Sequence, residues 1–127
     1  MARFLWICLG GAAGTGARYL LSLAMLRLAG PAFPWGTLLV NVLGSFLLGL
    51  ILEAQISTGW LSPTWNLALT TGVLGGFTTY STFNYETLRL LQAGAWWLGI
   101  ANLLGTVLGC LAAGALGFAF ARWLVGS

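Results

Sequence analysis

Residues Gly72–Glu86 read GVLGGFTTYSTFNYE, and this stretch decides the fold of a chain of 127 residues. It has three glycines in its first five positions and then four hydroxyl side chains before its terminal acid. Each glycine weakens a helix by roughly 1 kcal/mol relative to alanine, and hydroxyl side chains compete for backbone hydrogen bonds. We therefore expect the helix to break near the glycine pair Gly75-Gly76, within Gly75–Thr78.

The stretch lies inside an apolar region, which gives a break in the helix a functional meaning. Bare amides and carbonyls in lipid each cost several kcal/mol, so non-helical backbone persists at membrane depth only where protein buries it or water meets it. A broken helix also presents carbonyls that can hold a cation and amides that attract an anion. The sequence therefore predicts an ion site here.

The composition is that of an integral membrane protein. Hydrophobic residues make up 59% of the chain and charged residues 6%, too few charges to cover a soluble globule. The net charge of +3 comes without a basic cluster, so we expect no nucleic-acid partner. Cys8 and Cys110 lack CxxC spacing, which predicts free thiols. No nucleophile, metal-ligand triad or phosphate-binding loop is visible, so we expect no enzymatic activity.

Apolar segments long enough to cross a hydrocarbon core of about 30 Å fill the chain. We predict an all-α membrane protein with a single domain over residues 1–127 and four spans at about 4–28, 36–56, 64–91 and 96–124, the third being broken. Ser62-Pro63 is a helix-start signal for the third span. A cleaved signal peptide is the alternative for the first span, but its hydrophobicity continues past any cleavage point.

The arginines do not favour one orientation in the membrane. With four spans, Arg3 and Arg122 fall on one side, Arg27 and Arg89 on the other, and Arg18 is too interior to decide. Since orientation follows the side richer in basic residues, this balance predicts that copies insert both ways and pair antiparallel.

Three polar residues within the spans are candidates for function. Arg18 lies 15 residues into the first span, where it either meets carbonyls or an acid as a structural charge or attracts an anion to a pore mouth. Asn41 either makes an interhelical hydrogen bond or offers a donor to an anion path. Glu86 either pairs with an arginine or caps a helix, and a proton-coupled role is the weaker alternative.

Two further patterns are compatible with an anion path. Asn102, Thr106 and Cys110 recur every four residues and form one polar stripe on the fourth span. Tyr80 and Phe83 are three apart and share a helix face, where electropositive ring edges could contact an anion. Ordinary packing is the alternative for these rings.

The motifs resemble those of the bacterial Fluc (CrcB) fluoride channels, in order and over nearly the whole chain. The matching segments are Gly10-Gly11 with Gly14 and Ala17-Arg18-Tyr19, Gly36-Thr37-Leu38 with Val40-Asn41 and Gly44, and Gly72–Glu86. The resemblance implies an antiparallel, dual-topology homodimer in the lipid of the bacterial inner membrane. It also implies two fluoride pores, which lower cytoplasmic fluoride by passive export.

The resemblance also implies roles for individual residues. Main-chain carbonyls of Gly75 and Thr78 from both subunits would bind one structural sodium ion. The fluoride pathway would comprise Asn41, Tyr80, Ser81, Thr82, Phe83, Asn102 and Thr106, with Arg18 and Glu86 as pore-mouth or structural charges. The chain departs from the family pattern at Tyr80, where phenylalanine is usual, and at Cys110, where serine is common.

Two rival functions remain open from the sequence. A proton-coupled, dual-topology exporter of small cations would have a similar size, but it needs a carboxylate deep in a span, and Glu53 and Glu86 lie towards span ends. A non-conducting subunit of a heterodimeric channel would explain Tyr80 as a sign of a degenerate pore.

Overall fold

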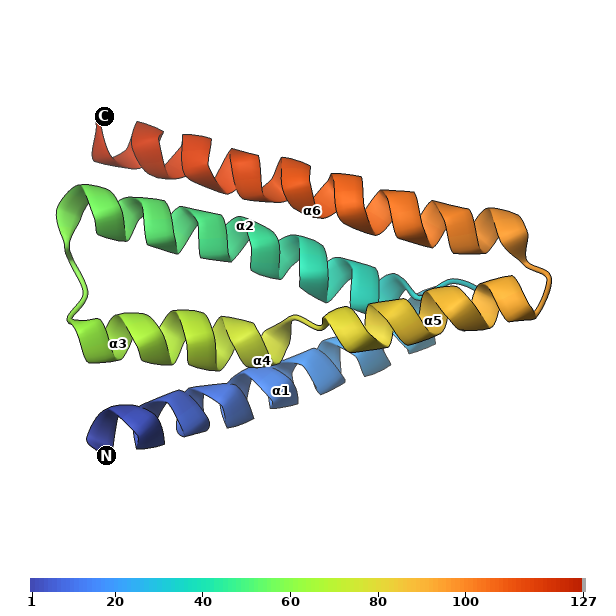
Figure 1. Cartoon of the computed structure of the whole chain (residues 1–127), viewed down its shortest axis with the longest axis horizontal. Helices are drawn as coiled ribbons and strands as arrows, with labels where there is room; N and C mark the ends of the chain where they lie inside the picture. Colours follow the sequence, from blue (N-terminus) through green and yellow to red (C-terminus); the bar gives the residue numbers. More distant parts are fainter. Residues whose placement is uncertain (127) are drawn as a thin grey trace.

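A computed structural model describes residues 1–126, and within them it contains helices and no strand (Figure 1). This agrees with the predicted all-α class. The helices are α1 (Ala2–Ala29), α2 (Trp35–Thr58), α3 (Pro63–Leu67), the π-helix η1 (Ala68–Leu74), α4 (Gly75–Phe77), α5 (Tyr80–Gln92) and α6 (Trp96–Val125).

The third span is broken, but later than the glycine pair that was expected to break it. Helices α3, η1 and α4 follow one another to Phe77, Thr78 and Thr79 are extended, and α5 starts at Tyr80. The predicted break near Gly75–Thr78 is therefore confirmed at Thr78, whereas its placement at the glycine pair was wrong by about two residues. Gly76 serves packing instead, because a Cβ there would lie 3.0 Å from Thr15 Oγ1 and even closer to the Gly11 carbonyl oxygen of α1.

Local signals explain the two ends of this span. Ser62 Oγ accepts a hydrogen bond from the Trp65 N–H at 3.4 Å, and Pro63 occupies the first turn, so the predicted helix start is confirmed. After the break, Thr79 Oγ1 accepts from the Thr82 N–H at 3.3 Å and caps α5. A threonine in an extended conformation is a normal N-cap, so the break is also an ordinary helix start.

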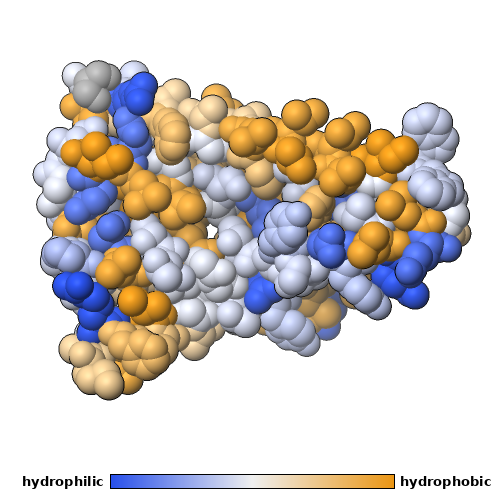
Figure 2. Space-filling model, viewed as in Figure 1, coloured by the Kyte–Doolittle hydropathy of each residue, from blue (hydrophilic) through white to orange (hydrophobic). Residues whose placement is uncertain are grey.

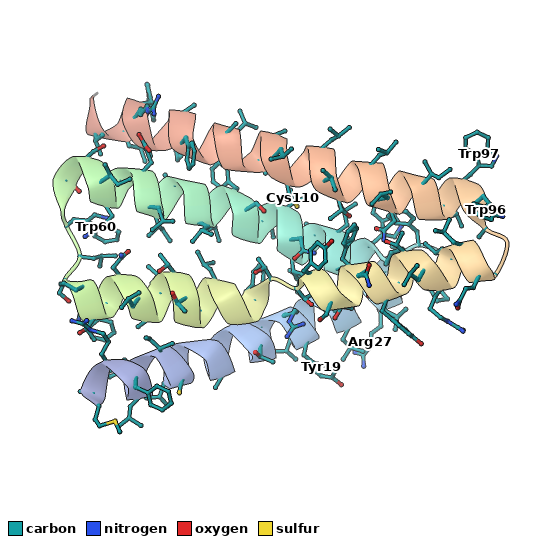
Figure 3. All side chains as sticks on the ribbon, viewed as in Figure 1. Tyr19, Arg27, Trp60, Trp96, Trp97 and Cys110 are labelled. Atoms are coloured by element: carbon teal, nitrogen blue, oxygen red, sulfur yellow. The ribbon has the colours of Figure 1, made fainter. Side chains whose placement is uncertain are left out.

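The helices have membrane-spanning character. Among the described residues, α2 and α6 are long and apolar enough to cross a membrane by length and composition. Both termini lie at the same end of the bundle (Figure 1), and hydrophobic residues run along the edge formed by α6 while hydrophilic residues gather towards the ends (Figure 2). Trp60 lies at one end and Trp96 and Trp97 at the other (Figure 3), as expected for residues at membrane–water interfaces.

Glycines set the closest packing between helices. The most extensive contact is between α2 and α6, and α1 packs along η1 and α4. A Cβ on Gly72 would lie 2.7 Å from the Ile7 carbonyl oxygen, and one on Gly14 would overlap the Val73 carbonyl oxygen. Between α2 and α6, a Cβ on Gly49 would lie 2.7 Å from the Gly114 carbonyl oxygen. Small residues of this kind let membrane helices approach backbone to backbone.

Candidate functional site

Asn41 holds the break in the third span. Its Nδ2 donates to the Thr79 carbonyl at 2.9 Å, and its Oδ1 accepts from the Thr79 N–H at 2.8 Å. Asn41 is buried in α2, and its Oδ1 replaces the helical partner that the Thr79 N–H lacks in the extended conformation. Its Nδ2 gives the Thr79 carbonyl a donor in addition to the first turn of α5. The interhelical interpretation of Asn41 is therefore confirmed. One Nδ2 hydrogen remains for another acceptor, because a side-chain amide has two donors.

Arg18 binds the backbone next to the same break. Its Nε donates to the Gly76 carbonyl at 3.0 Å, a contact between α1 and α4. This agrees with the interpretation of Arg18 as a structural charge that meets a carbonyl. It also brings a positive charge close to the break, where helix ends already present partial charges.

Two carbonyls at the break lack their usual helical partners. The donor four residues after Gly75 is the Thr79 N–H, which goes to Asn41, and the donor four residues after Thr78 is the Thr82 N–H, which goes to Thr79 Oγ1. The carbonyl oxygens of Gly75 and Thr78 are thereby free of those bonds. Such oxygens are the ligands that hard cations prefer.

A groove of about 510 Å³ lies between α2, the broken third span and α6, in front of the break. It brings together seven residues that the sequence singled out. These are Asn41, Gly75, Thr78, Tyr80, Phe83, Thr106 and Cys110. None of the described residues that line it carries a charge, and amide, hydroxyl and thiol groups provide its polar part. It can therefore offer hydrogen-bond donors to an anion without an acid to repel it.

The rings of Tyr80 and Phe83 meet in the groove as an edge-on pair. Their centroids are 5.8 Å apart and their planes are inclined by 67°. Phe83 is buried, whereas Tyr80 is 80% exposed in the single chain. Since aromatic edges are electropositive, this geometry leaves a ring edge available to an anion.

The polar stripe of α6 is divided in the structure. Thr106 and Cys110 line the groove, but Asn102 is fully buried behind it and does not. Asn102 Nδ2 donates to Thr87 Oγ1 at 2.8 Å. The three residues therefore share a helix face without forming one continuous track.

Two other predicted pathway residues also lie outside the groove. Ser81 is exposed on α5, and Thr82 Oγ1 accepts a hydrogen bond from Thr79 Oγ1 at 3.1 Å. Both follow the break directly, so the structure places them beside the groove and not in it. Their contact with an ion stays a prediction.

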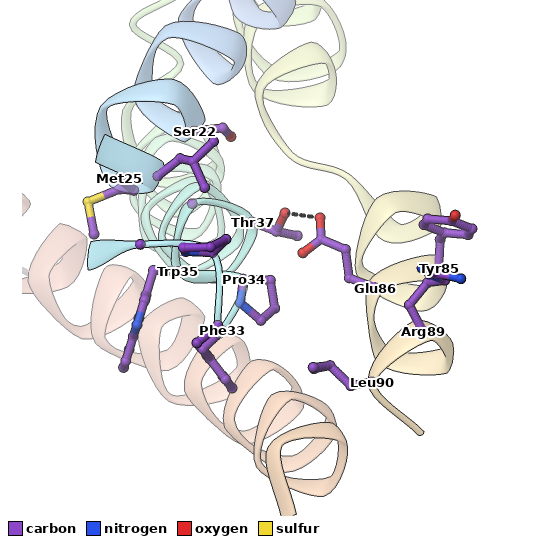
Figure 4. A pocket seen from close by; sticks show the side chains of 15 residues that line it. Ser22, Met25, Phe33, Pro34, Trp35, Thr37, Tyr85, Glu86, Arg89 and Leu90 are labelled. Atoms are coloured by element: carbon purple, nitrogen blue, oxygen red, sulfur yellow. Dashed lines mark hydrogen bonds between the residues drawn. The ribbon is translucent and has the colours of Figure 1, made fainter. Parts of the chain in front are cut away.

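Glu86 lines a second pocket, of about 450 Å³, near the α1–α2 turn (Figure 4). Its carboxylate accepts a hydrogen bond from Thr37 Oγ1 of α2 at 2.7 Å. Arg89 lines the same pocket, but within residues 1–126 the only ion pair is that of Arg122 with Glu53, at 2.7 Å. Of the alternatives for Glu86, pairing with an arginine is thus not found among these residues, and the carboxylate accepts its hydrogen bond from Thr37.

Sequence reasoning missed two threonines. Thr37 holds Glu86, and Thr87 receives the hydrogen bond of Asn102. Thr37 stands within a quoted motif of α2, so its polarity at membrane depth was an available signal. Thr87 lies inside the predicted third span and carried the same signal, but only the packing of α5 against α6 reveals Asn102 as its partner.

Comparisons with known proteins find similarity over nearly the whole chain. Residues 5–118 match the family described as CrcB-like protein, Camphor Resistance (CrcB). A protein of Sorangium cellulosum named "Fluoride-specific ion channel FluC" is 56% identical over 125 residues, 98% of either chain. Proteins of the same name from Anaeromyxobacter dehalogenans (99% of this chain, all of the relative) and Geobacter sulfurreducens (98% and all) are 56% and 50% identical. The chain belongs to the CrcB family.

Proposed function

We propose that the protein is a passive, fluoride-selective channel that lowers cytoplasmic fluoride. The observation that carries this is the identity of 56%, over 98% of both chains, with a protein named as a fluoride-specific ion channel. Hydrogen fluoride is a weak acid that crosses lipid as a neutral molecule and dissociates inside. The resulting ion is trapped unless a conduit exists, and a negative cell interior then drives it outwards without coupling to another ion.

The groove supports this function. Its remaining Asn41 donor, the Thr106 hydroxyl and the ring edges of Tyr80 and Phe83 face one uncharged space. A small anion loses its hydration shell in a narrow path, so several weak donors in sequence can replace water without binding the ion too tightly to release it. A proton-coupled cation exporter would instead need a carboxylate there.

We also propose that two copies assemble antiparallel in the bacterial inner membrane. The exposed face of α5 supports this, because Tyr80, Ser81, Asn84, Tyr85 and Arg89 are all exposed in the single chain. A row of polar groups facing lipid would be costly. A second copy, or a water-filled space enclosed between two copies, removes that cost.

The free carbonyls of Gly75 and Thr78 fit the structural sodium ion that is expected at the centre of such a dimer. Four oxygens from two copies could surround one hard cation, whose charge would stabilise the exposed carbonyl ends of the break. Because the ligands are backbone atoms, the test exchanges the ion. We expect replacement of sodium by N-methylglucamine to reduce fluoride conduction and dimer stability together. Unchanged conduction and unchanged dimer stability without sodium would contradict a structural ion.

The decisive experiment is ion efflux from liposomes that contain only this purified protein. Fluoride release is followed with a fluoride electrode, and chloride-loaded vesicles provide the comparison. We expect fast fluoride release with negligible chloride release, which would also exclude the need for a partner subunit. No release from protein that cross-linking shows to be dimeric would refute a homodimeric channel and favour the heterodimer.

A further inference from the structure

A series of three hydrogen bonds joins two residues that line the groove through two buried residues that do not. Thr106 Oγ1 donates to Asn102 Oδ1 at 3.4 Å, Asn102 Nδ2 donates to Thr87 Oγ1 at 2.8 Å, and Thr87 Oγ1 donates to the Phe83 carbonyl at 2.8 Å. Phe83 and Thr106 line the groove, whereas Asn102 and Thr87 do not. These bonds thus link a groove-lining residue of α5 to one of α6 through two residues that do not line the groove.

The central bond of this series links two helices in a dry environment. Asn102 is 0% exposed in α6 and Thr87 is 7% exposed in α5. Within residues 1–126, Asn102 to Thr87 is the only side-chain hydrogen bond between these helices. Helix α5 contacts α2 only weakly, so α6 is its main support. A hydrogen bond in a low-dielectric interior, with no water to replace it, fixes such a contact firmly.

The directions of these hydrogen bonds distinguish the roles of Asn102 and Thr87 from that of Thr106. The Thr87 proton is committed to the Phe83 carbonyl, and the Asn102 amide is committed to Thr87. Asn102 keeps a second Nδ2 hydrogen, but it is 0% exposed and does not line the groove, so it does not touch an ion there. The Thr106 bond is the longest of the three, at 3.4 Å, so its hydroxyl can turn away from Asn102 to meet an anion at small cost.

We propose that Asn102 and Thr87 form a positioning pair for ion selectivity. By holding α5 against α6, the pair keeps the Phe83 ring and the Thr106 hydroxyl at a fixed separation across the groove. That separation suits fluoride and disfavours the larger chloride, because chloride enters only if the two helices move apart. The inference rests on the proposed channel function and adds to it residues that act without contacting the ion.

The test compares fluoride and chloride efflux for Asn102→Leu, Thr87→Val and the double variant. Each single change lowers the preference for fluoride over chloride by about three- to tenfold, the factor expected for one hydrogen bond. The double variant shows no further loss, because both changes remove the same bond. Thr87→Ser keeps the hydroxyl and restores the preference. The control is Thr58→Val, since Thr58 Oγ1 likewise donates to the carbonyl four residues earlier, Ala54, at 2.7 Å, but lies at the end of α2.

Hydrogen exchange of α5 provides a second readout that does not depend on conduction. Asn102→Leu and Thr87→Val both speed exchange over Phe83–Gln92, and Thr87→Ser does not. An unchanged ion preference in both single variants, or losses that multiply in the double variant, would overturn the proposal. A wild-type protein that conducts neither ion would refute the channel function and the selectivity claim with it. Unchanged exchange in both variants would overturn the positioning itself.

Discussion

The two halves of the third span are held in opposite ways. Before the break, η1 and α4 press against α1 through glycines, with backbone close to backbone. After the break, α5 exposes polar side chains and is tied to α6 by the hydrogen bond from Asn102 to Thr87. Close backbone packing at glycines holds the first half, and a few polar contacts hold the second. One span can therefore combine a rigid support with a surface that is free to serve ions or a second copy.

The largest expected effect comes from removing the two hydrogen bonds by which Asn41 holds Thr79 at the break. Asn41→Leu leaves the Thr79 N–H without a partner, which costs about 1–3 kcal/mol, and removes one of the donors to the Thr79 carbonyl, which costs about 0.5–1.5 kcal/mol. We expect a loss of about 1.5–4.5 kcal/mol in the free energy of unfolding, measured by denaturant titration in detergent. The control is Thr58→Val at the exposed end of α2, the helix that carries Asn41, because Thr58 lies outside the proposed dimer surface. Equal free energies of unfolding for the two variants would contradict the role of Asn41 in holding the break.

The glycine-packed half is tested by adding one methyl group. Gly14→Ala places a Cβ against the Val73 carbonyl, and we expect a loss of about 1–3 kcal/mol in unfolding free energy from overpacking. Gly16→Ala is the control two residues away, because a Cβ there meets nothing within 4 Å. Since alanine favours helices, the control should be neutral or more stable by up to about 1 kcal/mol. A Gly14→Ala protein as stable as the control would mean that α1 and η1 can separate freely.

The smallest effect is expected at the ion pair that joins α2 to α6 outside both halves. Arg122 is 60% exposed at its side chain, and water screens its bond to Glu53. Arg122→Gln should cost at most about 1 kcal/mol in unfolding free energy, and less at high salt. The double variant with Glu53→Gln gives the coupling between the two charges. A larger loss that salt does not reduce would show that this pair is shielded from water.

Sequence reasoning succeeded where neighbouring residues decide the structure. Ser62-Pro63 marked a helix start, and the glycines and hydroxyls of Gly72–Glu86 predicted a break. The exact position of the break was missed, because it depends on Asn41 and on the approach of α1, which lie far away in the sequence. The π-helical turns of η1 were not foreseen for the same reason.

The sequence predicted several residues of the candidate site, but it did not predict how they are arranged in space. Asn41, Tyr80, Phe83 and Thr106 do face one groove. Helix periodicity placed Asn102 on the same face as Thr106, but it could not reveal that Thr87 of another helix would bury it. Periodicity gives the direction of a side chain, whereas its partner depends on how the helices pack.

The contact of Arg18 with Gly76 has a consequence for biogenesis. The two residues are 58 positions apart, so at about 5–20 residues per second the ribosome adds Gly76 roughly 3–12 seconds after Arg18. During that interval the first helix has emerged with a guanidinium whose carbonyl partner has not yet been synthesised. Its charge must stay hydrated, or be shielded by the insertion machinery, until the third span arrives. Arg18 thereby links the final placement of α1 to the arrival of α4.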